Sequence, residues 1–108
     1  MSYNVDISVQ ADCDIRGLYE YIAFLLLSPD NAVKQLERIE NAITSLADYP
    51  ERHKKYHSEP WAGRGLRVMP VDNYLVFYIP DRQTMTVSIV RVLYGRRDVE
   101  RILREEME

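Results

Sequence analysis

The spacing of apolar residues changes twice along this chain of 108 residues, and that change limits the possible folds more than any other feature of the sequence. Between Tyr3 and Val9, apolar residues take every second position, which is typical of a strand with one buried face. Between Ala11 and Leu46 they recur three and four positions apart, as on one face of an amphipathic helix. Alternation returns at Leu66. Strands on both sides of a helical region predict an α+β domain.

The helical region divides at Ser28-Pro29, because serine is favoured as an N-cap and proline at the first position of a helix. We expect a first helix over residues 11–26 and a second over residues 29–48, which Tyr49-Pro50 ends. A connection this short predicts an antiparallel helical hairpin. The stripes expected to be buried are Ala11, Ile15, Leu18, Ile22 and Leu25 or Leu26 in the first helix, and Val33, Leu36, Ile39, Ile43 and Leu46 in the second.

Three strands are expected after residue 65. The first begins at Leu66, and Asp72-Asn73 forms the turn to the second. The second strand, residues 74–79, is a continuous apolar run of the kind found in strands buried on both faces. The third covers residues 85–94. Its side chains should alternate between two faces, one with Val87, Ile89 and Arg91 and the other with Thr86, Ser88, Val90 and Val92.

The remaining segments complete the expected domain. Residues 51–65 contain both histidines and the only tryptophan without a consistent period, which indicates a loop long enough to suggest a function. Residues 96–107 show helical spacing and predict a short helix. We therefore expect one domain over residues 1–108 with a two-layer α+β architecture, in which the helical hairpin packs on one face of a mainly antiparallel four-stranded sheet.

The formal net charge of −3 conceals an asymmetry between the two halves of the chain. Residues 1–50 are strongly acidic, whereas residues 52–67 are basic and a second basic group precedes the end of the chain. A basic face can bind an anion or an acidic partner even on an acidic protein, although single charges of this kind are often only solvated. The candidate partner- or anion-binding residues are Lys54, Lys55, Arg64, Arg67, Arg91, Arg96 and Arg97.

Several classes of protein are not expected from this sequence. The single cysteine, Cys13, excludes an internal disulfide framework and a multi-cysteine zinc site. His53 and His57 are four positions apart, but they lie in a proline-flanked loop without a carboxylate motif, so no metal and no cofactor is expected. The N-terminus lacks the pattern of a signal peptide, and the longest apolar run, residues 22–27, is far below the ~20 residues of a membrane span. We expect a cytoplasmic protein without a membrane partner.

Five segments, in this order and spacing, resemble the RelE/ParE superfamily, the toxins of bacterial type II toxin–antitoxin modules, also called addiction or plasmid-stabilisation modules. They are residues 11–15 (ADCDI) with 21–23 (YIA), 43–50 (ITSLADYP), 65–68 (GLRV), 73–78 (NYLVFY) and 91–98 (RVLYGRRD). The resemblance spans nearly the whole chain and implies the same two-layer fold. It also implies one of two activities: RelE-like members cut mRNA at the ribosome without a metal, whereas ParE-like members bind and poison DNA gyrase. Members of both branches are neutralised by a cognate antitoxin.

Three positions bear on the choice between these branches. RelE-like members carry a catalytic arginine on the strand that corresponds to residues 74–78, and alignment places Tyr74 there. A phenol cannot supply the positive charge that stabilises a phosphate transition state. Arg67 is in register with a catalytic lysine of that branch, and Tyr94 or Arg96 occupies the position where other nucleases carry histidine or tyrosine. The resemblance thus implies Arg67 and Tyr94 as catalytic residues only if the chain is a nuclease.

The ending Gly95-Arg96-Arg97-Asp98, the long helical hairpin and the acidic total charge are more similar to the ParE-like branch. The first hypothesis is therefore a toxin that binds DNA gyrase. The alternatives are a ribosome-dependent, metal-free mRNA endoribonuclease and a non-toxic interaction module of the same fold. Whether the chain is an enzyme, which antitoxin it binds and its oligomeric state stay open at this point.

Overall fold

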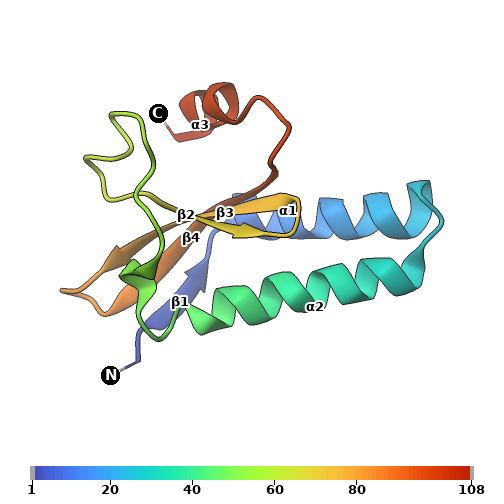
Figure 1. The fold of residues 1–108 in the computed structure, drawn as a ribbon, viewed down its shortest axis with the longest axis horizontal. Helices are drawn as coiled ribbons and strands as arrows, with labels where there is room; N and C mark the ends of the chain where they lie inside the picture. The colour runs from blue at the N-terminus through green and yellow to red at the C-terminus, as the bar shows by residue number, and fades with distance from the viewer. Residues whose placement is uncertain (1, 108) are drawn as a thin grey trace.

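The computed structural model describes residues 2–107. Four strands form one sheet in the order β1-β4-β3-β2, in which β1 runs parallel to β4 and the other neighbours are antiparallel. The expected α+β architecture is confirmed, and Figure 1 shows α1 and α2 on one side of the sheet and α3 on the other. The elements are β1 (Asn4–Ile7), α1 (Val9–Glu20), η1 (Tyr21–Leu25), α2 (Pro29–Ser45), η2 (Pro50–Arg52), β2 (Arg67–Val71), β3 (Tyr74–Asp81), β4 (Thr86–Tyr94) and α3 (Val99–Met107).

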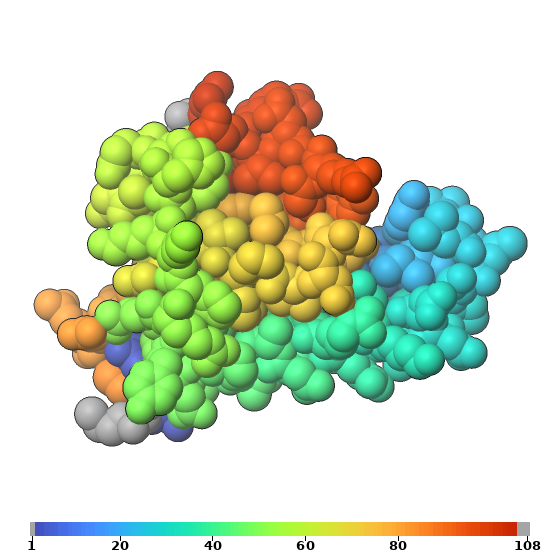
Figure 2. All heavy atoms as spheres, in the orientation of Figure 1, coloured from blue at the N-terminus to red at the C-terminus, as the bar shows by residue number. Residues whose placement is uncertain are grey.

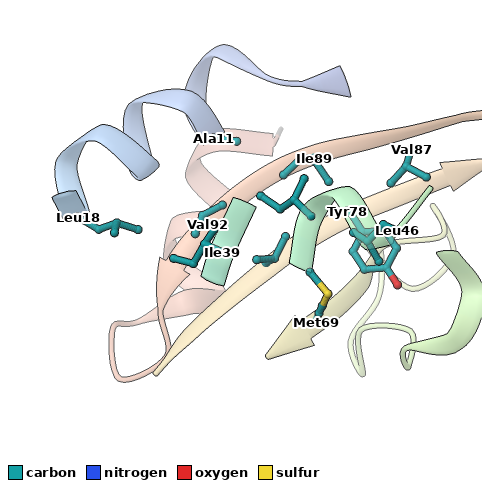
Figure 3. Packing of buried hydrophobic residues seen from close by; sticks show 11 residues of the cluster. Ala11, Leu18, Ile39, Leu46, Met69, Tyr78, Val87, Ile89 and Val92 are labelled. Carbon is teal, nitrogen blue, oxygen red and sulfur yellow. The ribbon is translucent and has the colours of Figure 1, made fainter. Parts of the chain in front are cut away.

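The first hydrophobic cluster lies between the helical hairpin and the sheet (Figure 3). Ile39 and Ile43 of α2 are buried there together with Val76 and Val87 of the central strands, as the sequence predicts. Large buried side chains lose contact with water over most of their surface, and each contributes about 1.5–3 kcal/mol to the stability of the fold. This cluster therefore fixes the hairpin on the sheet.

Helix α1 begins two residues earlier than expected because Ser8 caps it. The Ser8 hydroxyl accepts a hydrogen bond from the backbone N–H of Ala11 at 3.0 Å and donates one to the carbonyl of Val90 at 2.9 Å. A serine N-cap satisfies a backbone donor that the first helical turn leaves without a partner. The second bond ties the start of α1 to β4.

The hairpin turn differs from the prediction in its helical geometry. Residues Tyr21–Leu25 form a π-helical turn, and Leu27 adopts a left-handed φ of 53°. A π-turn is wider than an α-turn, so the side chains that follow it rotate out of the α-helical stripe. The prediction that Leu25 or Leu26 is buried is wrong, because both are exposed. A leucine in the left-handed region costs roughly 1–2 kcal/mol.

The stripe of α2 is also only partly as predicted. Val33 is exposed and Leu36 is half-buried, whereas Ala32 and Gln35 are buried in the same turns. The reason is the length of the hairpin: its tip extends past the edge of the sheet (Figure 1), so the first turns of α2 pack on α1 and η1 and not on strands. Ala32 is small enough for this helix–helix contact, and Gln35 is buried because its side-chain amide donates to the Asp72 carboxylate at 2.9 Å.

A β-bulge in β4 overturns the simple alternation expected for that strand. Tyr78 pairs with Ile89 and Phe77 pairs with Arg91, so Val90 is an extra residue opposite a single step of β3. An extra residue reverses which face the following side chains occupy. Val92 therefore joins Val87 and Ile89 in the cluster beneath the helices. The prediction that it shares a face with Ser88 is wrong.

The second face of the sheet is covered by the central loop, residues 53–66, and by α3. Tyr56 and Trp61 are buried there against Phe77 and Leu103, which anchors the loop through its own aromatic residues. Helix α3 begins at Val99, three residues later than expected, because the Asp98 carboxylate accepts a hydrogen bond from the N–H of Arg101 at 3.2 Å. Within residues 2–107, no helix combines the length and the apolar character that a membrane crossing requires.

Candidate partner-binding grooves

Arg91 is not on the surface with the other candidate cations. It is 9% exposed, and its guanidinium donates two hydrogen bonds to the Asp14 carboxylate of α1, at 2.7 and 2.8 Å. The same carboxylate accepts the backbone N–H of Val92 at 2.9 Å. Arg91 directly follows the bulge at Val90. Its pairing with Asp14 ties α1 to β4, so its guanidinium is engaged inside the protein, whereas Arg96 and Arg97 are exposed.

Arg67 holds the central loop in place. It lies at the start of β2, opposite Tyr78 of β3, and its guanidinium donates to the carbonyls of Glu51 at 3.1 Å and His53 at 2.7 Å. The Tyr78 hydroxyl donates to the carbonyl of Pro50 at 2.5 Å. These bonds satisfy loop carbonyls that would otherwise lose their contact with water. Arg67 thus has a structural role that the sequence pattern does not reveal.

Tyr94 lies at the opposite end of the sheet from Arg67. Its ring packs edge-on against Tyr74, with ring centroids 5.7 Å apart. Tyr94 pairs with Tyr74 and Arg67 pairs with Tyr78, and four residues along a strand span about 13 Å. The structure therefore does not bring Arg67 and Tyr94 together. Burial raises the pKa of the Tyr74 phenol, and the neighbouring Tyr94 and Tyr21 raise it further.

The hairpin groove is a cleft of about 810 Å³ between the inner side of the hairpin tip and the end of the sheet. Tyr21, Ile22 and Leu26 form one wall, and Tyr74, Val92 and Tyr94 are among the residues that form the other. The sequence assigns Ile22 and Leu26 to an ordinary core stripe and therefore does not reveal this groove. The apolar run of residues 22–27 is the sequence signal that could have indicated it.

The loop groove is a second cleft, of about 510 Å³, on the other face of the sheet. The central loop and the C-terminal part of the chain that includes α3 lie side by side above the strands, as Figure 2 shows. Lys55 and His57 line it from the loop, and Arg97 and Glu100 line it from the C-terminal segment. His57 Nε2 is 3.9 Å from Glu100 Oε1, and the Ser58 hydroxyl donates to the same oxygen at 2.9 Å.

The remaining candidate cations are exposed, and Arg97 and Lys55 among them line these clefts. Arg97 lines both grooves. Lys54, Lys55, Arg64 and Arg96 are also exposed. Exposed cations beside a cleft raise the local concentration of an acidic partner and speed its association. Within residues 2–107, no cluster of histidine, cysteine, aspartate and glutamate side chains has the arrangement that a metal ion needs.

A parallel N-terminal strand, a helical hairpin on one face of a four-stranded sheet and a short C-terminal helix on the other define the RelE/ParE class of toxin folds. The chain belongs to the ParE toxin family of the type II toxin–antitoxin system parDE, because the sequence model of that family matches residues 5–99. No relative among the curated proteins is found by sequence.

Solved structures of the same class share this fold at low sequence identity. A chain of the chromosomal ParDE system from P. aeruginosa is 17% identical, with a TM-score of 0.70 over 86% of this chain and 96% of that one. A mutant of the E. coli toxin RelE in the free state is 14% identical, with a TM-score of 0.67 over 99% and 96%. A chain of the complex RelBE2 from Mycobacterium tuberculosis is 23% identical, with a TM-score of 0.62 over 87% and 99%.

Proposed function

We propose that this chain is a toxin that inhibits DNA gyrase by binding it and that a cognate antitoxin neutralises it. The match of the ParE toxin family to residues 5–99 is the observation that carries this proposal. The family is described as the toxin of parDE, and the ParE-like branch is the one that the resemblance associates with gyrase. A binding toxin of this kind needs complementary surfaces and no chemistry of its own.

The geometry of the candidate catalytic residues supports binding over RNA cleavage. Metal-free cleavage requires a base, an acid and cations that converge on one phosphate. Arg67 is engaged by two loop carbonyls, Arg91 is buried with Asp14, and Tyr94 lies about 13 Å from Arg67 along the sheet. Tyr74, which takes the place of the expected arginine, packs on Tyr94. These residues do not form a single phosphate site.

The hairpin groove suits the antitoxin. An amphipathic segment can place its apolar side chains in a groove lined by Tyr21, Ile22 and Leu26, as helix-in-groove ligands do. Arg97 lies at its border, next to exposed Arg96, and favours acidic residues on the partner. The P. aeruginosa and M. tuberculosis relatives come from toxin–antitoxin systems, which is consistent with such a partner here.

The loop groove favours a second candidate function, ribosome-dependent mRNA cleavage. It combines the cations Lys55 and Arg97 with a His57–Glu100 pair, a set that can bind phosphate and move a proton. We rank this function second, because both side chains of the pair are largely exposed and Glu100 also brings negative charge to the groove.

The two functions predict different first effects in growing cells. A pulse of expression with labelled thymidine and labelled methionine followed in parallel should stop thymidine incorporation first, together with a DNA-damage response. Methionine incorporation that stops first, and that His57→Ala or Tyr94→Phe restores, would replace the gyrase proposal with the nuclease. Growth that is unaffected while an antitoxin still binds would leave only a non-toxic interaction module. Tyr94→Phe is a cleaner variant than Arg67→Ala, which also releases the central loop.

A further inference from the structure

The outer side of the hairpin tip exposes large apolar side chains that neither core cluster of the described residues includes. Phe24, Leu25 and Leu27 are 67%, 74% and 82% exposed, and we call these three residues the tip crest. Figures 1 and 2 show the tip projecting from the rest of the molecule. Exposed apolar patches of this kind mark interaction surfaces in soluble proteins.

The sequence around the tip crest has a distinctive charge pattern. No charged residue occurs between Glu20 and Asp30, and both of these flanking residues are acidic. Further along the hairpin the exposed charges are mixed, because Arg16, Lys34 and Arg38 accompany Asp12, Glu37 and Glu40. The acidic border therefore consists of Glu20 and Asp30, the charged residues nearest to the crest. The tip is thus an apolar crest with an acidic border, and its complement is an apolar pocket bordered by basic side chains.

The crest is distinct from the hairpin groove although the same turn builds both. Tyr21 and Leu26 face the groove, whereas Phe24, Leu25 and Leu27 do not line it. The π-turn and the left-handed Leu27 separate these two sets of side chains. A ligand in the groove therefore lies beside the crest without needing to cover it.

We propose that the tip crest is the surface by which this toxin binds its target enzyme, through an apolar pocket bordered by basic residues. This inference rests on the proposed function. An enzyme that acts on DNA presents basic surface to the phosphates, and the acidic border of the tip complements such a surface. An antitoxin seated in the neighbouring hairpin groove then blocks the target by its bulk.

Other occupants of the crest fit its chemistry less well. A second copy docked tip to tip would place Glu20 and Asp30 against their own counterparts, and like charges oppose such a contact. An anionic bilayer would repel the same border. The antitoxin is the third alternative. The exposed cations around the loop groove favour an antitoxin with an acidic segment, whereas the acidic border of the crest favours a basic partner.

The test measures binding of the purified protein to purified DNA gyrase and uses a matched control elsewhere on the chain. The tip variant combines Phe24→Gln with Leu27→Asn. Asparagine is chosen at position 27 because it accepts the left-handed backbone of Leu27. The control is Tyr49→Asn, since Tyr49 is also 82% exposed at a φ of 53° but lies at the other end of α2. We expect the tip variant to bind roughly 10- to 30-fold more weakly, as truncated hot spots do. The control should change binding less than about twofold.

A third variant tests the charge of the border. Glu20→Lys with Asp30→Lys should weaken binding at low salt and lose most of this effect at high salt, because exposed charges are screened. Circular dichroism and thermal unfolding of each variant show whether it is folded, and only folded variants are compared.

Each outcome decides a separate point. If the wild type binds gyrase and the tip variant binds it equally well, the inference is overturned and the proposed function is left intact. Absence of gyrase binding by the wild type overturns the proposed function and this inference with it. A wild type that dimerises in sedimentation, where the tip variant is monomeric with unchanged gyrase binding, assigns the crest to a second copy and overturns the inference. Loss of antitoxin binding alone assigns it to the antitoxin and does the same.

Discussion

Replacing Asp14 by alanine should destabilise the protein more than any surface change, because its partner Arg91 is buried. The two side chains are 12% and 11% exposed, and the carboxylate accepts both guanidinium hydrogen bonds and the N–H of Val92. Removing one partner of a buried pair costs about 3–5 kcal/mol, since the other charge stays out of water. We therefore expect Asp14→Ala to lower the free energy of unfolding by that amount.

Urea unfolding followed by circular dichroism measures this loss as a lower midpoint at constant slope. Asp12→Ala is the matched control, because Asp12 lies two positions earlier on the exposed side of α1, where it pairs with Arg16. Its loss should stay within about 1 kcal/mol, as for other surface ion pairs. A loss below 1 kcal/mol for Asp14→Ala would refute the assignment of Arg91 to the interior, and Arg91 would then return to the surface cations.

Three further predictions concern the core, the loop and the antitoxin. Ile39→Ala should cost about 2–5 kcal/mol in urea unfolding, Leu36→Ala clearly less and exposed Val33→Ala within ~0.5 kcal/mol; equal losses would contradict the packing of α2. Burial lowers the pKa of His53 below 6.5, and the positive charge of Arg52 lowers it further by a smaller amount. The folded state therefore favours the neutral imidazole. Its stabilising contribution is complete above pH 6.5 and is lost as pH falls through the lowered pKa. His53→Gln should therefore reduce the fall in melting temperature on acidification, and an unchanged fall would exclude His53 as its source. The association rate with the antitoxin should decrease as salt increases, and a rate independent of salt would remove the electrostatic part of the argument.

The fold could be predicted because its signals are local. The change from alternating to helical spacing places the hairpin between strands, and Ser28-Pro29 marks the start of α2. The errors occur where the structure departs from a regular period by one step. The π-turn at Tyr21–Leu25 and the extra residue Val90 each shift the following side chains, and an apolar run reads the same in either register. Such shifts are defined only against a neighbouring element.

The candidate site was less predictable, because its residues acquire their roles from distant partners. Arg91 and Asp14 are 77 positions apart, and nothing in either segment indicates that they pair. Arg67 has the sequence context of a catalytic cation, yet it binds loop carbonyls. Lys55 and Arg97 do line the loop groove, as a partner-binding role requires. Whether these residues contact a partner stays a prediction.

Supercoiling of relaxed plasmid by purified DNA gyrase tests the central claim most directly. The wild-type protein should inhibit supercoiling in proportion to its concentration and leave cleaved plasmid after denaturation, without cutting RNA in a parallel reaction with programmed ribosomes. Undiminished supercoiling together with cleavage of ribosome-bound mRNA would contradict the claim and make this ParE-family chain a nuclease.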